Sequence, residues 1–468
     1  MSEVQTGTPQ ANCFRDALAE GKFIFLAECT PPENEDLAPA AAERLMPLIR
    51  MMAGQQDLCG GVAFTDRREA PWSAVELAAA LPEELRSRNL CFLSGDGRDE
   101  EAIKAQLDLA RRAGVPNIVP VSGHAGASVR ECRRRVRCGS TEQLRLIQDL
   151  PLFAGTTFNP FHYDADTVLA SYRSLDGKLK AGAQFIIAQS GWDMVQNQAL
   201  AWYLLRQKQF TPLLAHITLL TPDKLEKIAA GAIPGLRMTA AFRKLLSREL
   251  MGSKAQFEAA QYRRLELQVA GCRLMGYSGV IVSGVDVPGR AALVATRIRS
   301  ALQEFRGFEH WLSEYNEHQA SAEMSFGLKA YHLFDRMLRR AYPFDEPPEI
   351  TVPEAADYSL GERWGYRIRK MLFSKADRQR PNRDILLKKL LVGCSSCDSC
   401  TLPQHHYYCV RNCPKHLENG PCGGVGVDGD CELGGDECIF VRIMRCHRYM
   451  MEHPAVDTAH RKDMLYRD

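Results

Sequence analysis

Between residues 22 and 305, short apolar runs that favour β-structure alternate with longer amphipathic stretches that favour helices. The apolar runs predict strands at 23–27, 58–64, 89–93, 118–121, 152–157, 185–188, 213–217 and 279–283. Eight strands with a helical crossover between each pair, over about 280 residues, have the size and rhythm of a (β/α)8 barrel. We therefore predict an α/β fold built on a TIM barrel. A doubly wound open sheet is the alternative, but no glycine fingerprint follows the first strand.

The alternation stops after residue 305. The stretch 307–340 has a helical pattern, and 341–358 carries four prolines and five carboxylates without a basic residue, which is typical of a linker. From 362 to 389 the charge reverses, with ten Lys or Arg side chains against three acidic ones. We expect a barrel domain at 15–305, a helical region and charged linker at 306–390, and a small cysteine-rich metal-binding domain at 391–450.

Length, charge and composition limit the number of domains, the class of partner and the cellular compartment that we expect. The 468 residues exceed the size at which one hydrophobic core stops growing. A net charge of +2 indicates neither nucleic acid nor a membrane surface as the main partner. The chain shows no signal-peptide pattern and no apolar run of about 18 residues, so we expect a cytoplasmic protein that does not span a membrane. In that reducing compartment, packed cysteines are more often metal ligands than disulfides.

Nine of the sixteen cysteines fall between Cys394 and Cys446. The glycines and prolines among them leave little apolar material for a core, which indicates a region held together by metal. Cys394-x2-Cys397-x2-Cys400 is the spacing that wraps three corners of an iron–sulfur cube, with a remote fourth thiolate. The remaining cysteines could close a second site. Zinc can use the same ligands, with several histidines nearby, so iron–sulfur is favoured at the first site and both metals stay open at the second.

Polar side chains gather where the predicted strands end, which is where TIM barrels carry their active sites. Glu28 ends the first strand and precedes the rigid Thr30-Pro31-Pro32 turn. A carboxyl group held there, partly shielded from water, could donate a proton. A carboxylate that only forms a salt bridge at a strand end is the alternative.

Three segments of the barrel region resemble methylenetetrahydrofolate reductases. They are A-E-C-T-P-P at 27–32, A-G-V-P-N-I-V-P-V-S-G-H at 113–124 and A-G-A-Q-F-I-I-A-Q-S-G-W-D at 181–193. The likeness runs in order over about residues 15–290, and the third segment is its most specific part.

This resemblance implies a flavin, FAD in preference to FMN, at the barrel mouth. It implies reduction of 5,10-methylenetetrahydrofolate to 5-methyltetrahydrofolate, or the reverse, in one-carbon metabolism, with NAD(P)H as one possible electron source. Glu28 would match the general acid, and Gln189 and Asp193 would contact the folate substrate. The residues expected to bind the flavin are Thr65, Arg98, Ser122, Gly123, His124, Asn159 and Lys178.

Two departures from the family pattern open an alternative. His124 stands where the family has an aspartate beside the flavin, and Gly95-Asp96-Gly97 replaces most of an R-D-R element of which Arg98 remains. A histidine there would retune the flavin by favouring its anionic reduced form. If the flavin is lost instead, the chain would be a non-redox, folate-binding or methyl-handling partner of a methyltransferase or demethylation system.

The cysteine-rich region resembles the C-terminal domain that accompanies many bacterial methylenetetrahydrofolate reductases. The N-G-P-C-G-G run at 419–424 is its most specific feature. The resemblance implies eight metal ligands, Cys394, Cys397, Cys400, Cys409, Cys413, Cys422, Cys431 and Cys438, and leaves Cys446 as an additional cysteine. Electrons could then reach the flavin from an electron-carrier protein or a second redox subunit. The basic stretch 363–389 could dock an acidic carrier such as a ferredoxin, or be a solvated helix, and an oligomer is possible.

Overall fold

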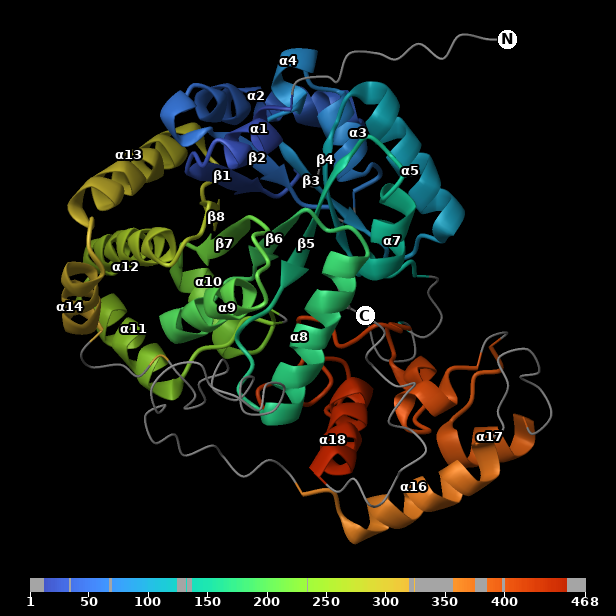
Figure 1. Ribbon diagram of the computed structural model, residues 1–468. Helices are drawn as coiled ribbons and strands as arrows, with labels where there is room; N and C mark the ends of the chain where they lie inside the picture. The colour runs from blue at the N-terminus through green and yellow to red at the C-terminus, as the bar shows by residue number, and fades with distance from the viewer. Residues whose placement is uncertain are drawn as a thin grey trace, which may run out of the picture. The chain divides into compact units, whose positions relative to one another are not determined.

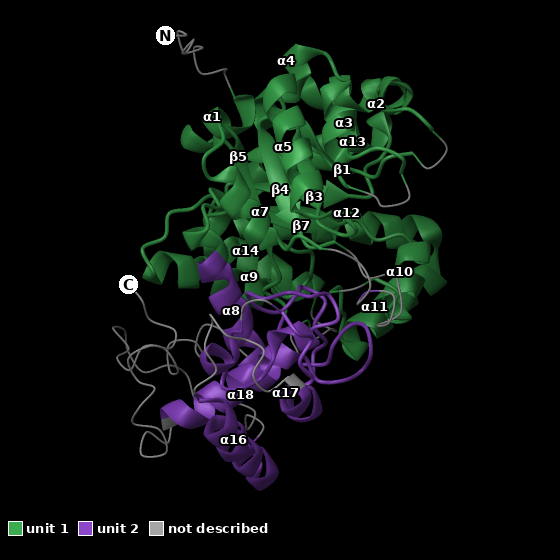
Figure 2. Cartoon of the chain, turned by 90° about the vertical axis from the view of Figure 1, so that its right-hand side faces the viewer, with its two compact units in different colours: residues 1–123, 136–161, 178–326 green, residues 124–135, 162–177, 327–468 purple. Residues whose placement is uncertain are grey.

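A computed structural model describes residues 12–32, 35–66, 70–123, 132, 137–233, 235–319, 324, 357–374, 385–397 and 400–452. The chain divides into two compact units (Figure 2). Unit 1 comprises Met1–Gly123, Val136–Phe161 and Lys178–Phe326, and unit 2 comprises His124–Arg135, His162–Gly177 and Gly327–Asp468.

Unit 1 contains a closed barrel of eight parallel strands in sequence order (Figure 1). The strands are β1 (Ile24–Cys29), β2 (Gly61–Phe64), β3 (Leu90–Ser94), β4 (Asn117–Val121), β5 (Phe153–Phe158), β6 (Phe185–Ala188), β7 (Leu213–Thr218) and β8 (Gly279–Ser283). Pairing of β1 with β8, in the register Ile24 with Gly279, closes the circle. The predicted eight-stranded α/β barrel is therefore confirmed, and the open sheet is excluded.

Strand β2 begins three residues later than the sequence predicts. Residues Gln56–Leu58 form a 3-10 turn instead of extended chain. Gly60 then passes so close to the preceding helix that a Cβ there would lie 2.2 Å from the carbonyl oxygen of Met52. Local crowding, which a hydrophobic pattern does not record, sets the start of this strand.

The amino-terminal end of the barrel is filled with apolar side chains. Helix α1 (Cys13–Ala19) inserts Phe14 against Phe153 and Phe185, with ring centroids 6.1 Å and 5.1 Å away. Gly155 makes room for this packing, because a Cβ there would lie 2.3 Å from the Phe185 ring. Some polar side chains are buried at this end too, such as Asn12, whose amide donates to Oδ1 of Asn117, the first residue of β4, at 2.8 Å.

Helices surround the strands of unit 1. They are α2 (Ala38–Ala53), α3 (Ala74–Ala79), α4 (Glu83–Arg86), α5 (Glu100–Ala113), α7 (Ser140–Ile147), α9 (Met194–Arg206), α10 (Pro222–Ala229), α11 (Ala240–Gly252), α12 (Lys254–Leu274), α13 (Pro288–Glu304) and α14 (Phe308–His318). Helix α8 (Ala165–Lys180) connects β5 to β6, and its residues up to Gly177 belong to unit 2.

Unit 2 has an apolar core that the cysteine-rich stretch does not supply by itself. Its helices are α16 (Leu360–Phe373), α17 (Ile385–Val392) and α18 (Ile439–Glu452), with the short turns η2 (Leu402–His405) and η3 (Val410–Asn412). Buried side chains from α8, α16 and α18 share one cluster with the cysteines, among them Leu169, Tyr366, Phe373, Val441 and Met444. The cysteine-rich stretch itself adds Leu402, Tyr407, Tyr408, Val410, Leu417 and Val425, so the prediction that it offers little apolar material for a core is wrong.

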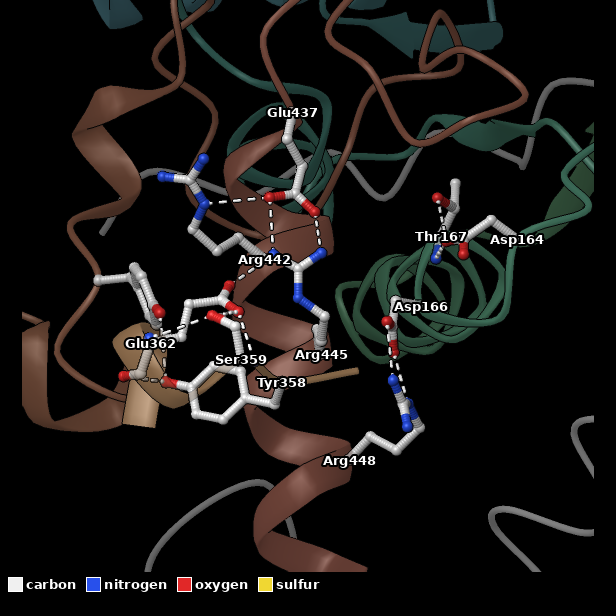
Figure 3. A network of polar contacts seen from close by, with 11 residues as sticks. Asp164, Asp166, Thr167, Tyr358, Ser359, Glu362, Glu437, Arg442, Arg445 and Arg448 are labelled. Carbon is white, nitrogen blue, oxygen red and sulfur yellow. Dashed lines mark hydrogen bonds and ion pairs between the residues drawn. The ribbon is translucent and has the colours of Figure 1, made fainter. Parts of the chain in front are cut away.

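Ion pairs tie these helices together within unit 2 (Figure 3). Arg445 of α18 pairs with Glu437 and, at 2.7 Å, with Glu362 of α16. Arg448, one turn further along α18, lies 3.0 Å from Asp166 of α8, whose side chain is 1% exposed. Burial raises the pKa of Asp166 above its ordinary value, and the Arg448 guanidinium opposes that shift.

Removing Arg448 should leave a buried carboxylate without its partner. We expect Arg448→Ala to lower the free energy of unfolding by about 3–5 kcal/mol, since the lone charge stays desolvated. The loss should shrink at acidic pH, where Asp166 takes up a proton. Urea denaturation measures it, and the Arg448→Met, Asp166→Asn double variant serves as the control. Equal losses in the single and double variants would contradict this account of the pair.

Candidate functional site

Glu28 lies at the carboxyl-terminal end of the barrel, near a histidine from the opposite side of β8. It is the next-to-last residue of β1, and its side chain is 20% exposed. Nε2 of His216, from β7, lies 3.5 Å from Oε1 of Glu28. Strands β1 and β7 both pair with β8, which brings together two residues that are far apart in the sequence. This separation is longer than a hydrogen bond, so proton exchange between the two side chains would need a closer approach or a bridging water.

A chain of hydroxyl groups continues along the same edge and ends on a lysine. Ser190 donates a hydrogen bond to Oγ1 of Thr218 at 2.8 Å, and Ser283 approaches the same oxygen at 3.1 Å. Nζ of Lys224, in the first turn of α10, donates to Ser283 at 3.4 Å. Burial lowers the pKa of Lys224, while the nearby Glu28 carboxylate acts in the opposite direction. The mouth between β6 and β1 therefore combines an acid, a base and a partly buried cation.

Sequence reasoning did not single out Lys224 or Ser283 as site residues. The available signal for Lys224 was Thr221-Pro222, a helix start directly after a predicted strand exit. That signal places the lysine in the first turn of a crossover helix but does not show that it turns toward β8.

The two predicted folate-contacting residues lie after β6. Gln189 is half-buried, and its backbone N–H donates to the carbonyl of Phe158 at 2.7 Å. Asp193 is buried and caps α9, where its Oδ1 accepts from the backbone N–H of Val195 at 3.0 Å. Asp193 thus has a structural task in addition to its predicted role toward the substrate.

Arg98, predicted to bind the flavin, is engaged inside the protein. Its guanidinium pairs with Asp66, whose side chain is 1% exposed, and donates to the carbonyl of Ser94 at 2.8 Å. A second buried pair, Asp96 with Arg137 at 3.0 Å, lies beside it. These two pairs connect the loops that follow β2, β3 and β4. The sequence did not reveal them, because each joins residues far apart along the chain.

The structure also describes three predicted flavin-binding residues of the neighbouring loops, Thr65, Ser122 and Gly123. Thr65 follows β2 and donates to the carbonyl of Cys29 at 3.4 Å, and the carbonyl of Ser122 accepts from Arg137 at 3.0 Å. Gly123 has a φ of +85°, and a Cβ there would lie 2.5 Å from Cβ of Asp96. Only glycine fits this close approach between the loops.

Asn159 and Lys178 lie near the end of β5, and His124 falls outside the described residues. Asn159 is buried and accepts the backbone N–H of Phe161 at 3.0 Å. Nζ of Lys178 donates to the carbonyl of Thr157 at 3.0 Å. The flavin roles of these residues remain predictions.

The eight predicted metal-ligating cysteines fall into two groups of four. Burial raises the pKa of Cys409, and the charges of its neighbours add to that shift; these are Cys394, Cys397 and Cys400. Burial likewise raises the pKa of Cys413 to about 11, and the neighbouring Cys422 and Cys431 contribute to this shift. Burial also raises the pKa of Cys438, with contributions from Cys422 and Cys413. We call Cys394, Cys397, Cys400 and Cys409 the first quartet, and Cys413, Cys422, Cys431 and Cys438 the second quartet.

All four cysteines of the second quartet line one cavity of about 350 Å³. Lys415 and Glu432 line it too and form a buried ion pair, and Sγ of Cys422 lies 3.6 Å from Oε1 of Glu432. Among the described residues, no three His, Cys, Asp or Glu side chains already surround a point at metal-bonding distance. Eleven further residues line the same cavity, so its volume does not measure the space between the four thiols and favours neither zinc nor an iron–sulfur cluster.

Two histidines near the cysteines contact each other, and the additional cysteine lies in neither quartet. Nδ1 of His447 lies 3.2 Å from Nε2 of His406, and its Nε2 lies 3.0 Å from the guanidinium of Arg173. Since Arg173 can only donate, Nε2 of His447 accepts and Nδ1 carries the proton. Cys446 is buried beside Tyr358, and burial raises its pKa to about 12.

The C-terminal region is similar to a known family. Residues 374–464 match the family described as methylene-tetrahydrofolate reductase C terminal, which confirms the resemblance predicted for this region. The chain thus joins an eight-stranded α/β barrel to a cysteine-rich region of that kind. A search of curated proteins found no match.

Among solved structures, one described as "Uncharacterized protein from Clostridium thermocellum binds two copies of 5-methyl-5,6,7,8-tetrahydrofolic acid" is similar to this chain. The two share 14% sequence identity with a TM-score of 0.44, over 61% of this chain and 97% of that chain. Within the part of our chain that the structure describes, no helix is long and apolar enough to cross a bilayer.

The capping role of Asp193 can be separated from a role toward substrate. We expect Asp193→Ala to lower the free energy of unfolding by about 1 kcal/mol, because the amino end of α9 loses its side-chain acceptor. Asp193→Asn keeps an acceptor and should unfold like the wild type in a denaturant titration. If Asp193→Asn nevertheless weakens folate binding, the carboxylate contacts the substrate; if both variants unfold like the wild type, the cap does not stabilise α9.

Proposed function

We propose that this protein is a flavin-dependent oxidoreductase that interconverts 5,10-methylenetetrahydrofolate and 5-methyltetrahydrofolate in one-carbon metabolism. The observation that carries this proposal is Glu28 beside His216 at the mouth of an eight-stranded barrel, in a chain whose residues 374–464 match the reductase C-terminal family. FAD is the proposed flavin, in preference to FMN.

The residues near the mouth suit a flavin nucleotide in their donor chemistry. Thr65 offers a hydroxyl, Asn159 an amide and Lys178 a cation, and Gly123 lets two loops approach closely. When bound, the flavin would supply or accept the hydride. Arg98 would contribute only the N–H groups that Asp66 and Ser94 leave over.

The protein's own task is to move a proton and orient the folate. Protonated Glu28 would give its proton to the folate nitrogen as the methylene bridge opens, leaving an iminium carbon that can be reduced. The amide of Gln189, at the end of β6, can donate and accept at once and so suits the edge of the pterin ring. In the reverse direction the Glu28 carboxylate would take the proton back.

We further propose that the two cysteine quartets hold iron–sulfur clusters. The C-x2-C-x2-C spacing of Cys394, Cys397 and Cys400, with Cys409 close by, supports a cluster in the first quartet, and four thiols that line one cavity would supply the ligands in the second. Lys415 is already paired with buried Glu432 there, so this pair adds no net positive charge beside the thiolates. Electrons would then enter through the clusters from a carrier protein or a second redox subunit, or directly from NAD(P)H at the barrel.

One observation favours the second candidate, a folate-binding or methyl-handling partner without redox chemistry. The buried pairs Asp66 with Arg98 and Asp96 with Arg137 draw together the loops where the resemblance places the flavin. In addition, a Cβ on Gly95 would lie 1.8 Å from the carbonyl oxygen of Cys138, so these loops are tightly packed. Folate binding by protein that takes up no flavin would support this candidate.

Replacing Glu28 should separate proton transfer from binding. In anaerobic protein loaded with FAD, we expect Glu28→Gln to slow reduction of the flavin by methyltetrahydrofolate by about 10²–10⁴-fold, since the amide cannot exchange the proton. Stopped-flow absorbance gives the rate, and folate affinity should change little. Glu258→Gln, at an exposed position of α12, is the control. A Glu28→Gln variant as fast as the wild type would exclude Glu28 as the proton-transfer residue.

The metal assignment can be tested with a matched pair of cysteine variants. We expect anaerobically purified protein to contain iron, and Cys422→Ser to lose iron from the second quartet because a thiolate ligand is removed. Cys446→Ser should keep the wild-type iron content, because Cys446 lies in neither quartet. Elemental analysis measures both. Zinc in place of iron, or equal iron loss in the two variants, would overturn the assignment.

A further inference from the structure

Helix α16 carries apolar side chains on two faces. Tyr366 and Phe373 are buried in the core of unit 2. Leu360, Trp364, Ile368 and Met371 are exposed, and their spacing of four, four and three residues places them in one stripe along the helix. Trp364, the largest, is 63% exposed. We call these four residues the α16 ridge.

Helix α17 reverses the usual arrangement of polar and apolar residues. Leu386 and Leu390 are more than 80% exposed, and Leu387 and Leu391 are more than a third exposed, whereas Lys388 is only 4% exposed. We call these four leucines the α17 ridge. Exposed apolar patches of this kind mark interaction sites, because isolated proteins rarely leave so many large side chains in water.

The stretch that carries both ridges is rich in positive charge. The described residues of 362–389 include six Lys or Arg side chains, of which Lys388 is buried, and one acidic side chain, Glu362. Glu362 is already paired with Arg445 at 2.7 Å. The guanidinium of Arg367 lies 5.7 Å from the ring of Trp364, which places a cation directly on the α16 ridge. An acidic partner would therefore be attracted to this surface, whereas a second copy of the same surface would be repelled.

The α17 ridge adjoins the first quartet. Helix α17 ends at Val392, and Gly393, with a φ of +62°, turns the chain directly into Cys394. The backbone N–H of Cys394 donates to the carbonyl of Lys388 at 3.3 Å, and Asn412 donates to that of Val392 at 2.9 Å. A protein bound to α17 would thus stand next to the first quartet, which gives it a short path for an electron.

We propose that the α16 and α17 ridges form a docking surface for an acidic electron-carrier protein that exchanges single electrons with a cluster in the first quartet. In each exchange the reduced carrier loses one electron, the cluster gains it, and no proton or bond changes. The electron-transfer part rests on the proposed iron–sulfur clusters, whereas the docking part rests on the ridges and their charge.

The test uses the full chain, purified without oxygen, and a reduced acidic ferredoxin as the probe. In Leu386→Glu, Leu390→Glu double-variant protein we expect the half-saturating ferredoxin concentration for cluster reduction to rise at least about tenfold. Reduction by methyl viologen, which needs no docking surface, should be unchanged. Wild-type reduction by ferredoxin should weaken as salt is raised. Phe210→Glu, an exposed apolar residue in unit 1, is the control and should behave as wild type.

Each other outcome overturns the proposal. Equal rates with ferredoxin in the variant and the wild type would mean that the α17 ridge docks nothing. Slowing with both donors would mean that the leucines support the cluster itself.

A direct binding measurement tests the docking surface separately from the proposed function. If the protein contains no iron, the proposed clusters fail, and ferredoxin binding to the immobilised chain still decides whether the surface docks an acidic carrier. Binding to phosphatidylglycerol vesicles without binding to ferredoxin would assign the surface to a membrane. Self-association that the variant abolishes would assign it to a second copy.

Discussion

Closure of the barrel by β1 and β8 is the constraint on which the site depends. Every strand then has two hydrogen-bonded neighbours, and all eight carboxyl ends meet at one rim. Phe14, Phe153 and Phe185 pack together at the opposite end, and the candidate site residues lie at this rim. The same closure carries β7 next to β8 and β8 next to β1, so that His216 reaches Glu28. Loss of the β1 and β8 register would separate the pair.

The cysteine-rich region depends on a different principle. Buried side chains of its own, such as Tyr407 and Val410, join Tyr366, Phe373 and Met444 of the helices in one core around the cysteines. Ion pairs of Arg445 and Arg448 hold α18 to α16 and α8. Packing therefore arranges the two quartets, and metal binding would complete them. Coupling of metal binding to folding should then be weaker than in a zinc finger, which has no such core.

The sequence was sufficient for the barrel and for residues that stand next to a strand end. Gln189 was singled out by the resemblance of residues 181–193, and Glu28 could be found because strand periodicity places it at the rim. The buried pairs of Asp66 with Arg98 and Asp96 with Arg137 could not, because each depends on loops that meet only after folding. Lys224 was missed because the helix start at Thr221-Pro222 does not show that the lysine turns toward β8. The leucines of α17 have an ordinary helical spacing, which predicts that they face the core. Only the structure shows that they face solvent and that Lys388 is buried instead.

The central claim is that the barrel mouth carries out folate redox chemistry with a flavin. The most direct test is the absorbance spectrum of anaerobic, FAD-loaded wild-type protein before and after methyltetrahydrofolate is added. The account predicts a visible band of bound flavin that the folate bleaches, because the flavin takes the hydride. A flavin band that stays unchanged while the folate binds, or a protein that retains no flavin, would contradict it.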